Sequence, residues 1–419
     1  MRTLVVVSAI LMVHCIAPWG LVLRSSATAA PQDSPAQQVS PAEAARVRSQ
    51  IRAVEEILPR TPERGAALFL LAQLYSRIGE LRKTLALLEE CVGLDQGFDP
   101  GAAPRFRALK DNPRFRELVE KVRVNYRPVS HAQVSFTVAE SDLFPEGISV
   151  DTEKRVFYMG SMHRKKIVKI TASGEVTDFV KTDSYDLPPV GGTRVDLRNH
   201  DVWAASDPGV KNRSELLHFN EQGKLLERFA APGRGLHDLN DLVLRGEDEV
   251  YTTDTDGNVV FRFDRKTHRF SPLRLHRAIF YPNGITLSGD AERLYFGDLL
   301  GVVVVDLRTG ESRDVIPDAH DTLAGIDGLY WYKSDLIGVQ YGTAAFRIMR
   351  WHLAKDGQSV ESSEVLERGT EMVKDPTTAA IFEGKLYYMA NTGIDNLQND
   401  RIVDASRLEP VKIAVLALE

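Results

Sequence analysis

The chain has 419 residues, of which 43% are hydrophobic and 26% are charged, which is enough for one large globular domain or two smaller ones. Its formal net charge is -6 and it has no basic stripe, so nucleic acid is not expected as a partner. Of its two cysteines, Cys15 lies in an N-terminal apolar run. The other, Cys91, would stand alone in the mature protein, so no internal disulfide or thiolate metal cage is expected. It is expected to be a small buried helix residue.

The first 29 residues have the pattern of an export signal. One positive charge in "MRT" precedes a long apolar run, and Ala27-Thr28-Ala29 forms an A-x-A cleavage site. The run is nearly long enough to span a membrane, so an uncleaved anchor is the alternative. We expect an exported protein, periplasmic or secreted, without membrane contact after cleavage. Residues 30–40 are polar and proline-bearing, and are expected to form a flexible linker.

Residues 41–127 have a helical period and are predicted to form a small α-helical region. Part of it matches the spacing of a tetratricopeptide repeat, although Thr84 stands where that pattern prefers alanine. One such repeat cannot bury its faces alone, so we expect it to dock on flanking helices or on the following domain, and to offer a surface to a protein partner. The matching positions are Ala72, Tyr75, Gly79, Leu88 and Cys91.

Residues 132–419 alternate between apolar and polar positions in short runs separated by Gly, Asp, Asn and Pro. Six similar units recur at intervals of 43 to 50 residues, each with about four strands, and this predicts an all-β, six-bladed β-propeller. The last unit lacks one strand, which the segment 132–138 is expected to supply, closing the ring. The lead residues of the six units are Glu146, Gly191, Asn240, Asn283, Asp327 and Thr377.

The lead residue of each unit is predicted to face one mouth of the central channel. Glu146, Asn240, Asn283 and Asp327 would bring side-chain oxygens together there, and two converging carboxylates resist ionisation unless a cation compensates them. The all-oxygen set favours Ca²⁺ before Mg²⁺, with Mn²⁺ and Zn²⁺ as further alternatives. Taken singly, Asn283-Gly284 and Asp327-Gly328 are ordinary turn dipeptides, so the shared register is what indicates a metal site.

The same stretches, "PEGISVD", "LNDLVL", "YPNGITLS" and "IDGLYW", resemble the blade-start motifs of the senescence-marker protein/gluconolactonase (regucalcin-like) family of calcium-dependent propeller hydrolases. The resemblance spans about 132–419 and leaves out the helical region. It implies that Glu146, Asn283 and Asp327 are metal ligands and that Asn240 is a fourth ligand or a substrate contact. It also implies that Asp327 activates the hydrolytic water, and that the substrate is a lactone or related ester.

One departure from the family concerns substrate binding. Sugar-lactonase members resemble "R-x-N-D" at the third unit, whereas this chain has "HDLND", with Asp238 in the place of the arginine. Asp238 is therefore a candidate substrate-binding residue, and a sugar-acid lactone is disfavoured.

Other candidates have a functional and a structural interpretation. His237 and His320 precede predicted blade starts, and His237 is a candidate general base, with a surface-loop histidine as the alternative for each. "TDTDGN" (253–258) is expected to be a hairpin turn, because the glutamate of a calcium loop is missing. No phosphate-binding loop and no G-x-S-x-G motif occurs, which disfavours a serine hydrolase. A non-catalytic binding scaffold with a structural calcium, and strictosidine-synthase-like chemistry, stay open.

Overall fold

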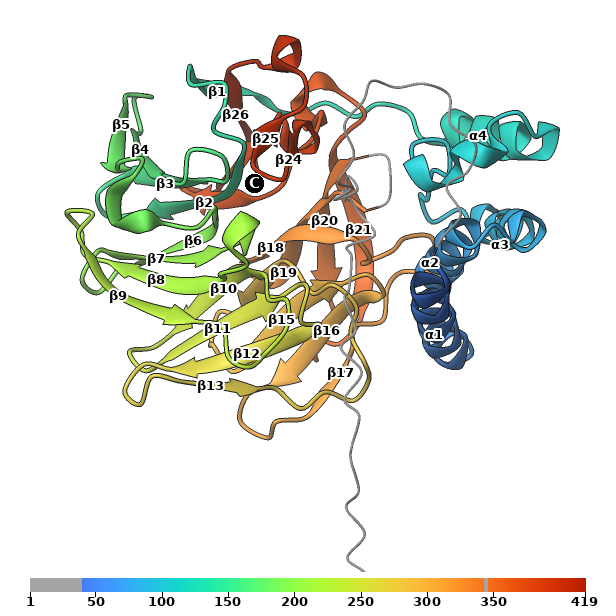
Figure 1. Ribbon diagram of the computed structural model, residues 1–419, viewed down its shortest axis with the longest axis horizontal. Helices are drawn as coiled ribbons and strands as arrows, with labels where there is room; N and C mark the ends of the chain where they lie inside the picture. Colours follow the sequence, from blue (N-terminus) through green and yellow to red (C-terminus); the bar gives the residue numbers. More distant parts are fainter. Residues whose placement is uncertain (1–39, 343–345) are drawn as a thin grey trace, which may run out of the picture.

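The computed structural model describes residues 40–342 and 346–419, and within them six four-stranded antiparallel sheets form a β-propeller with helices at one side (Figure 1). The predicted fold, a six-bladed propeller preceded by a small helical region, is confirmed. The expected signal, 1–29, lies outside the described residues, as does the linker apart from Ser40. None of the described helices is long and apolar enough to cross a membrane.

The helical region precedes the propeller in the chain. The Ser40 hydroxyl accepts a hydrogen bond from the Glu43 amide at 3.2 Å and caps the first helix. Cys91 is 1% exposed, as expected, and burial raises the pKa of its thiol. The assignment to the tetratricopeptide class stays a prediction. The helices are α1 (Pro41–Ile57), α2 (Arg64–Arg77), α3 (Leu81–Gly93) and α4 (Pro113–Asn125), with a 3₁₀ turn at Pro104–Leu109.

Each blade is an antiparallel sheet whose strands follow one another outward from the axis. The first three blades are β2 (Pro145–Asp151), β3 (Val156–Ser161), β4 (Ile167–Thr171) and β5 (Val176–Val180); β6 (Val190–Asp196), β7 (Asp201–Ser206), β8 (Glu215–Phe219) and β9 (Leu225–Ala230); β10 (Leu239–Arg245), β11 (Glu249–Asp254), β12 (Val259–Asp264) and β13 (Arg269–Pro272). The next two are β14 (Ile285–Leu287), β15 (Arg293–Asp298), β16 (Gly301–Asp306) and β17 (Ser312–Asp314); β18 (Ile326–Tyr332), β19 (Asp335–Gln340), β20 (Arg347–Leu353) and β21 (Val360–Arg368).

The sixth blade joins the two ends of the propeller sequence. It has the order β22 (Ala379–Phe382), β23 (Lys385–Met389), β26 (Val411–Ala417) and β1 (Gln133–Val138). β1 pairs with β26 from Gln133 opposite Val415 to Val138 opposite Val411, so the segment 132–138 supplies the missing strand as predicted. Pairing of the first and last strands of the propeller in one sheet closes the ring of blades. A small hairpin, β24 (Leu397–Gln398) and β25 (Arg401–Ile402), lies between β23 and β26.

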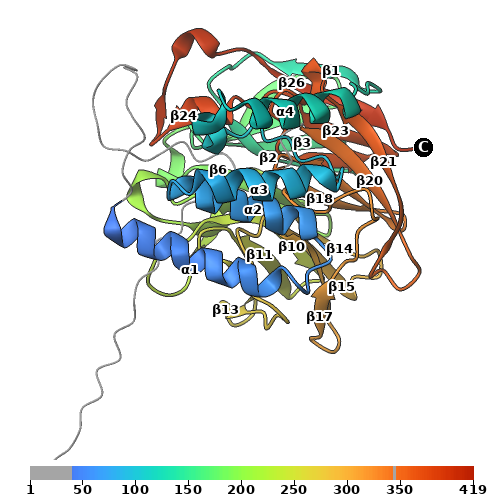
Figure 2. The same cartoon turned by 90° about the vertical axis from the view of Figure 1, so that its right-hand side faces the viewer.

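The helical region packs against loops that connect the strands of the fourth and fifth blades. Figure 2 shows the helices lying in front of the propeller when the molecule is viewed from that side. Leu70 and Leu74 of α2 share an apolar cluster with Tyr281 and Leu299 of the fourth blade. Ala324, which precedes β18, is buried in a second cluster with residues of α2 and α3. The helices therefore contact the segments that lead into the predicted site.

Candidate metal and substrate site at the channel mouth

The four predicted ligands stand at matching places on the innermost strands. Asn283 precedes β14, whereas Glu146, Asn240 and Asp327 are the second residues of their strands and still line the channel mouth. The reason is a β-bulge, which turns a side chain out of the alternation of the sheet. The pairing register shifts between Pro145 and Ile148 in β2, Leu239 and Leu242 in β10, and Ile326 and Gly328 in β18.

A glycine follows Glu146, Asn283 and Asp327, but not Asn240, and each of these glycines has a packing role. A Cβ on Gly147 would lie 2.1 Å from the Gly191 carbonyl oxygen, and one on Gly284 would lie 2.6 Å from the Asp327 carbonyl oxygen. Neighbouring innermost strands approach closely here, so only glycine fits. The turn interpretation of Asp327-Gly328 is wrong, because this dipeptide lies inside β18, where a Cβ on Gly328 would meet the Tyr330 hydroxyl at 2.6 Å.

A cavity of about 220 Å³ lies at this mouth of the channel. Glu146, Asn240, Asn283 and Asp327 all line it, so the structure brings the four predicted ligands together. Gly191, the lead residue of the second blade, brings no side chain and leaves room beside Glu146, whose Oε2 would lie 3.6 Å from a Cβ there. Further lining residues are Asp207, Asp238, Thr255, Tyr281, Asp298, Tyr341 and Thr377.

Each amide lies beside a carboxylate. Asn240 Nδ2 donates to Glu146 Oε1 at 3.3 Å, and Asn283 Nδ2 donates to Asp327 Oδ1 at 2.7 Å. Asn283 Oδ1 is buried and has no hydrogen-bond partner, which is costly for a polar atom. Rotation of either amide would present its oxygen beside the carboxylate, an arrangement that is repulsive unless a cation lies between them.

The two carboxyl groups are shifted toward the neutral form. Burial raises the pKa of Glu146 to about 7, with Asp207 and Asp241 adding to the rise, while the hydrogen bond from Asn240 opposes it. Burial also raises the pKa of Asp327 well above its usual range, with Glu146 adding to the effect. These are the shifts expected of acids that converge without a cation, and ion binding would have to displace their protons.

The donor set fits a hard cation better than a soft one. Two carboxyl groups and two amide oxygens are the ligands that Ca²⁺ and Mg²⁺ prefer, and no histidine or cysteine is among the described residues of the lining. Among the described residues, no three His, Cys, Asp or Glu side chains form a metal-binding group by themselves. The site therefore depends on its two asparagines.

Asp238 lies in the cavity wall, and His237 points elsewhere. His237 Nδ1 lies 2.5 Å from Asp254 Oδ2, and Asp254 Oδ1 accepts the Asp238 amide at 2.9 Å. The hydrogen bond with Asp254 raises the pKa of His237, and its buried Nε2 has no partner. His237 is not among the described residues that line the cavity. His320 lies on an exposed loop, and "TDTDGN" forms the β11–β12 hairpin turn, both as expected.

The sequence interpretation missed a second ring of acidic residues. Asp207 follows β7, and Asp298 ends β15, so both come from the second strand of a blade rather than the first. Burial raises the pKa of Asp238, and the negative charge of Asp207 adds to the rise. Asp298 is instead compensated by Arg277, whose Nη1 lies 2.7 Å from Asp298 Oδ2. The available signal was the polar residue that closes the second strand of most units.

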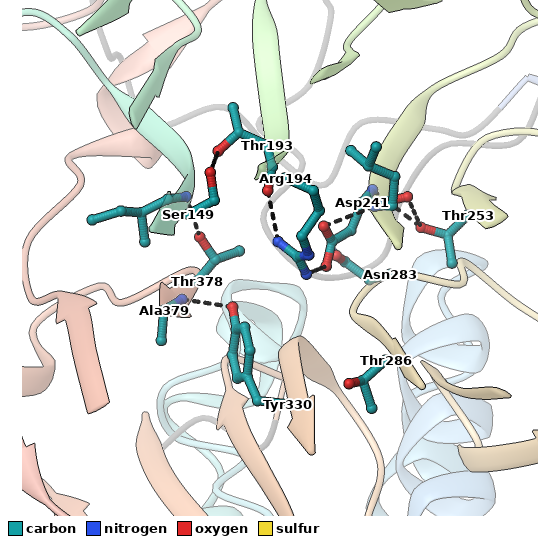
Figure 3. Close-up of polar contacts among 12 residues, drawn as sticks. Ser149, Thr193, Arg194, Asp241, Thr253, Asn283, Thr286, Tyr330, Thr378 and Ala379 are labelled. Atoms are coloured by element: carbon teal, nitrogen blue, oxygen red, sulfur yellow. Dashed lines mark hydrogen bonds and ion pairs between the residues drawn. The ribbon is translucent and has the colours of Figure 1, made fainter. Parts of the chain in front are cut away.

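Deeper in the channel, the charges are compensated within the protein (Figure 3). Arg194 Nη2 donates to Asp241 Oδ2 at 3.0 Å, and Asp241 Oδ1 accepts the Leu242 amide at 2.8 Å. The Ser149 and Thr193 hydroxyls are 3.0 Å apart beside this pair. Asp241 is therefore a member of a buried ion pair.

No protein-family model matches the chain, and no curated protein matches it. Solved structures with a similar overall shape include a gluconolactonase from Xanthomonas campestris, at TM-score 0.48 and 14% identity, covering 68% of this chain and 88% of that one. A PQQ-bound aldose sugar dehydrogenase from Streptomyces coelicolor has TM-score 0.48 and 14% identity over 69% and 99%. A virginiamycin B lyase from Staphylococcus aureus has TM-score 0.46 and 16% identity over 61% and 80%. Similarities at this level carry no argument about activity, so the residues of the channel mouth must carry it.

Proposed function

We propose that this protein is an exported, calcium-dependent hydrolase of esters or lactones, with Glu146, Asn240, Asn283 and Asp327 holding the ion. The observation that supports it most is the buried, unpartnered Asn283 Oδ1 beside the acid Asp327, inside a cavity that a small molecule can enter. When bound, the ion would supply Lewis-acid polarisation of the substrate carbonyl and of water.

The residues of the cavity have distinct roles in this proposal. Asp327 would hold the ion and would accept a proton from water. Burial favours its neutral form, which makes its carboxylate a stronger base than an exposed aspartate. Tyr281 and Tyr341 line the cavity and would exclude water from an acyl or alcohol group.

His237 has two interpretations in the same proposal. In a purely structural role, which we call a brace, His237 contacts Asp254, and Asp254 accepts a hydrogen bond from the Asp238 amide. As the predicted general base it would exchange a proton with substrate through an intervening water. The variant His237→Gln separates these roles, because loss of a base lowers kcat by about 100-fold or more, whereas loss of a brace changes KM more than kcat.

The charge of the cavity limits the class of substrate. None of the described lining residues is a lysine, arginine or histidine, while Asp207 and Asp238 stand beside the four proposed ligands. The ion would compensate Glu146 and Asp327, whereas no lysine, arginine or histidine of the described lining lies beside Asp238. Neutral or cationic esters are therefore favoured, and substrates with a carboxylate or phosphate are disfavoured.

The test is metal analysis of the purified protein, followed by assays of aryl esters and lactones with and without a chelator. We expect about one Ca²⁺ per chain by analogy with one four-ligand site, and activity that the chelator removes and calcium restores. A folded protein that binds no divalent ion would contradict the proposal. Calcium binding without hydrolysis of either substrate class would favour the binding-scaffold alternative.

A further inference from the structure

Glu63, at the start of α2, is a carboxyl group of the helical region buried against the propeller. Only 1% of the residue is exposed. Its Oε1 accepts the Leu323 amide at 2.7 Å, and its Oε2 accepts the Thr322 hydroxyl at 2.6 Å. Glu63 occupies the N-cap position of α2, yet its side chain makes no capping hydrogen bond. The carboxyl group is thus used to hold the propeller rather than its own helix.

The segment that Glu63 holds, residues 321–325, leads directly into the candidate site. We call it the mouth loop. Gly325 lines the cavity, and Asp327 follows it after one residue. The loop is also held by Gln340, whose Nε2 donates to the carbonyl oxygens of Thr322 and Ala324, each at 2.9 Å. Glu63 and Gln340 therefore both hold the mouth loop, Glu63 through the loop's donors and Gln340 through the loop's acceptors.

The side chain of Glu63 is closely packed against the backbone of Gly301. A Cβ on Gly301, at the start of β16, would lie 2.7 Å from Glu63 Cγ, and Gly301 has φ of +121°. A second contact nearby joins the same two regions, because Gln96 Nε2 donates to the Ala319 carbonyl oxygen at 3.3 Å. The helical region therefore contacts the propeller through specific hydrogen bonds as well as through apolar packing.

Burial raises the pKa of Glu63 to about 8, and the negative charges of Asp321 and Asp314 add to the rise, while the two hydrogen bonds oppose it. These two acids are the charged groups that act on Glu63. Each has its own cation, since Arg347 pairs with Asp321 at 2.7 Å and Arg277 pairs with Asp314 at 2.7 Å. Burial therefore favours the protonated acid, whose proton would lie between Oε2 and the Thr322 hydroxyl, and loss of that proton at alkaline pH leaves a buried charge.

We propose that Glu63 is a positioning residue of the candidate site, through which the helical region fixes the mouth loop and so the place of Asp327. This inference rests on the proposed function. It gives the helical region a part in calcium binding and turnover, whereas the sequence suggested a separate surface for a protein partner.

The experiment compares Glu63→Ala and Thr322→Val, which break the contact from its two sides, with Glu63→Gln, which keeps an acceptor for the Leu323 amide. Arg114→Ala, which removes an exposed ion pair with Glu89 within the helical region, is the control. All are made in the full chain. The readouts are hydrogen exchange over 321–327, calcium affinity by calorimetry, and kcat and KM for 4-nitrophenyl acetate between pH 6 and 9.

We expect Glu63→Ala and Thr322→Val to speed exchange in the mouth loop and to lower calcium affinity and kcat by about tenfold, as for other residues that orient ligands. Glu63→Gln should retain kcat above pH 8, where the wild type declines. Unchanged exchange in the mouth loop, or faster exchange with unchanged calcium affinity and kcat, overturns the inference. A wild type that neither binds calcium nor hydrolyses esters overturns the proposed function instead, and exchange then shows whether Glu63 fixes the loop at all. Should Glu63→Ala fail to fold, Thr322→Val and the pH profile of Glu63→Gln decide.

Discussion

Buried acidic groups are compensated at one level of the channel and not at another. At the deeper level Asp241 is 1% exposed and is compensated by Arg194 at 3.0 Å. At the mouth Asp327 is 8% exposed and Glu146 is half-buried, and among the described residues their carboxyl groups accept hydrogen bonds from the neutral amides of Asn283 and Asn240. Arg194 supplies a cation to Asp241, whereas the described lining of the mouth contains no lysine, arginine or histidine. The mouth is therefore suited to a cation from solution.

The largest effect is expected from removing the internal cation. Arg194→Met leaves Asp241 buried and uncompensated, which should lower the free energy of unfolding by about 3–5 kcal/mol. Denaturant unfolding measures this change. The double variant Arg194→Met with Asp241→Asn should recover most of it, and a single variant as stable as the wild type would show that the deeper pair is not needed.

At the mouth, removal of a charged group should have the opposite effect on the stability of the calcium-free protein. Asp327→Asn removes a ligand charge, so calcium affinity and hydrolysis should fall by more than about 100-fold, beyond the loss typical of residues outside the ligand set. Without calcium the variant should melt at a higher temperature than the wild type, because burial disfavours the Asp327 carboxylate. Calorimetry and thermal melting in a chelator test both halves. A lower melting temperature with undiminished calcium affinity would contradict the assignment.

Calcium binding should depend on pH at the mouth. The pKa of Glu146 is raised to about 7 in the folded, ion-free protein. Its protonated form therefore contributes stability that is complete below the unfolded pKa and is lost as the pH rises through about 7. Calcium needs the carboxylate, so its affinity should rise about tenfold from pH 6 to pH 8, with proton release below pH 7. Calorimetry in buffers of different ionisation enthalpy counts these protons, and an affinity independent of pH would refute the shift.

The smallest expected effect concerns Asp238, which lines the cavity beside the proposed ligands. Acetylcholine and 3,3-dimethylbutyl acetate have the same shape and differ by one positive charge. Asp238→Asn should reduce the preference for the charged ester by about fivefold, the size of one partly screened charge interaction. Ratios of kcat/KM measure this preference, with Arg114→Ala as the matched control. An unchanged ratio would mean that Asp238 does not face the substrate.

Much of this arrangement could be predicted from residue order. The period of 43 to 50 residues predicts the blades, and the short sixth unit predicts the closing strand, because both follow from local alternation and chain connectivity. The four lead residues share a cavity because equal places in equal blades face one axis. The bulges at these places were not predictable, since they depend on how each innermost strand pairs with the next.

Other features depend on contacts between distant segments. The polar residues that close the second strands are visible in the sequence, but it does not show that Asp207 and Asp298 share a cavity with Glu146, because they come from different strands of different blades. Likewise, "PERG" does not indicate that Glu63 reaches Thr322, 259 residues further on.

The sequence by itself determined the ring of blades and the four oxygen-bearing residues at its mouth, because repeated hydrophobic patterns are local and cumulative. The tertiary structure alone decided which buried charges are compensated. Arg194 neutralises Asp241, Arg277 neutralises Asp298, and no cationic side chain in the described lining serves Glu146 or Asp327. Charge compensation depends on distances of a few ångströms between residues far apart in the chain, and only folding sets those distances.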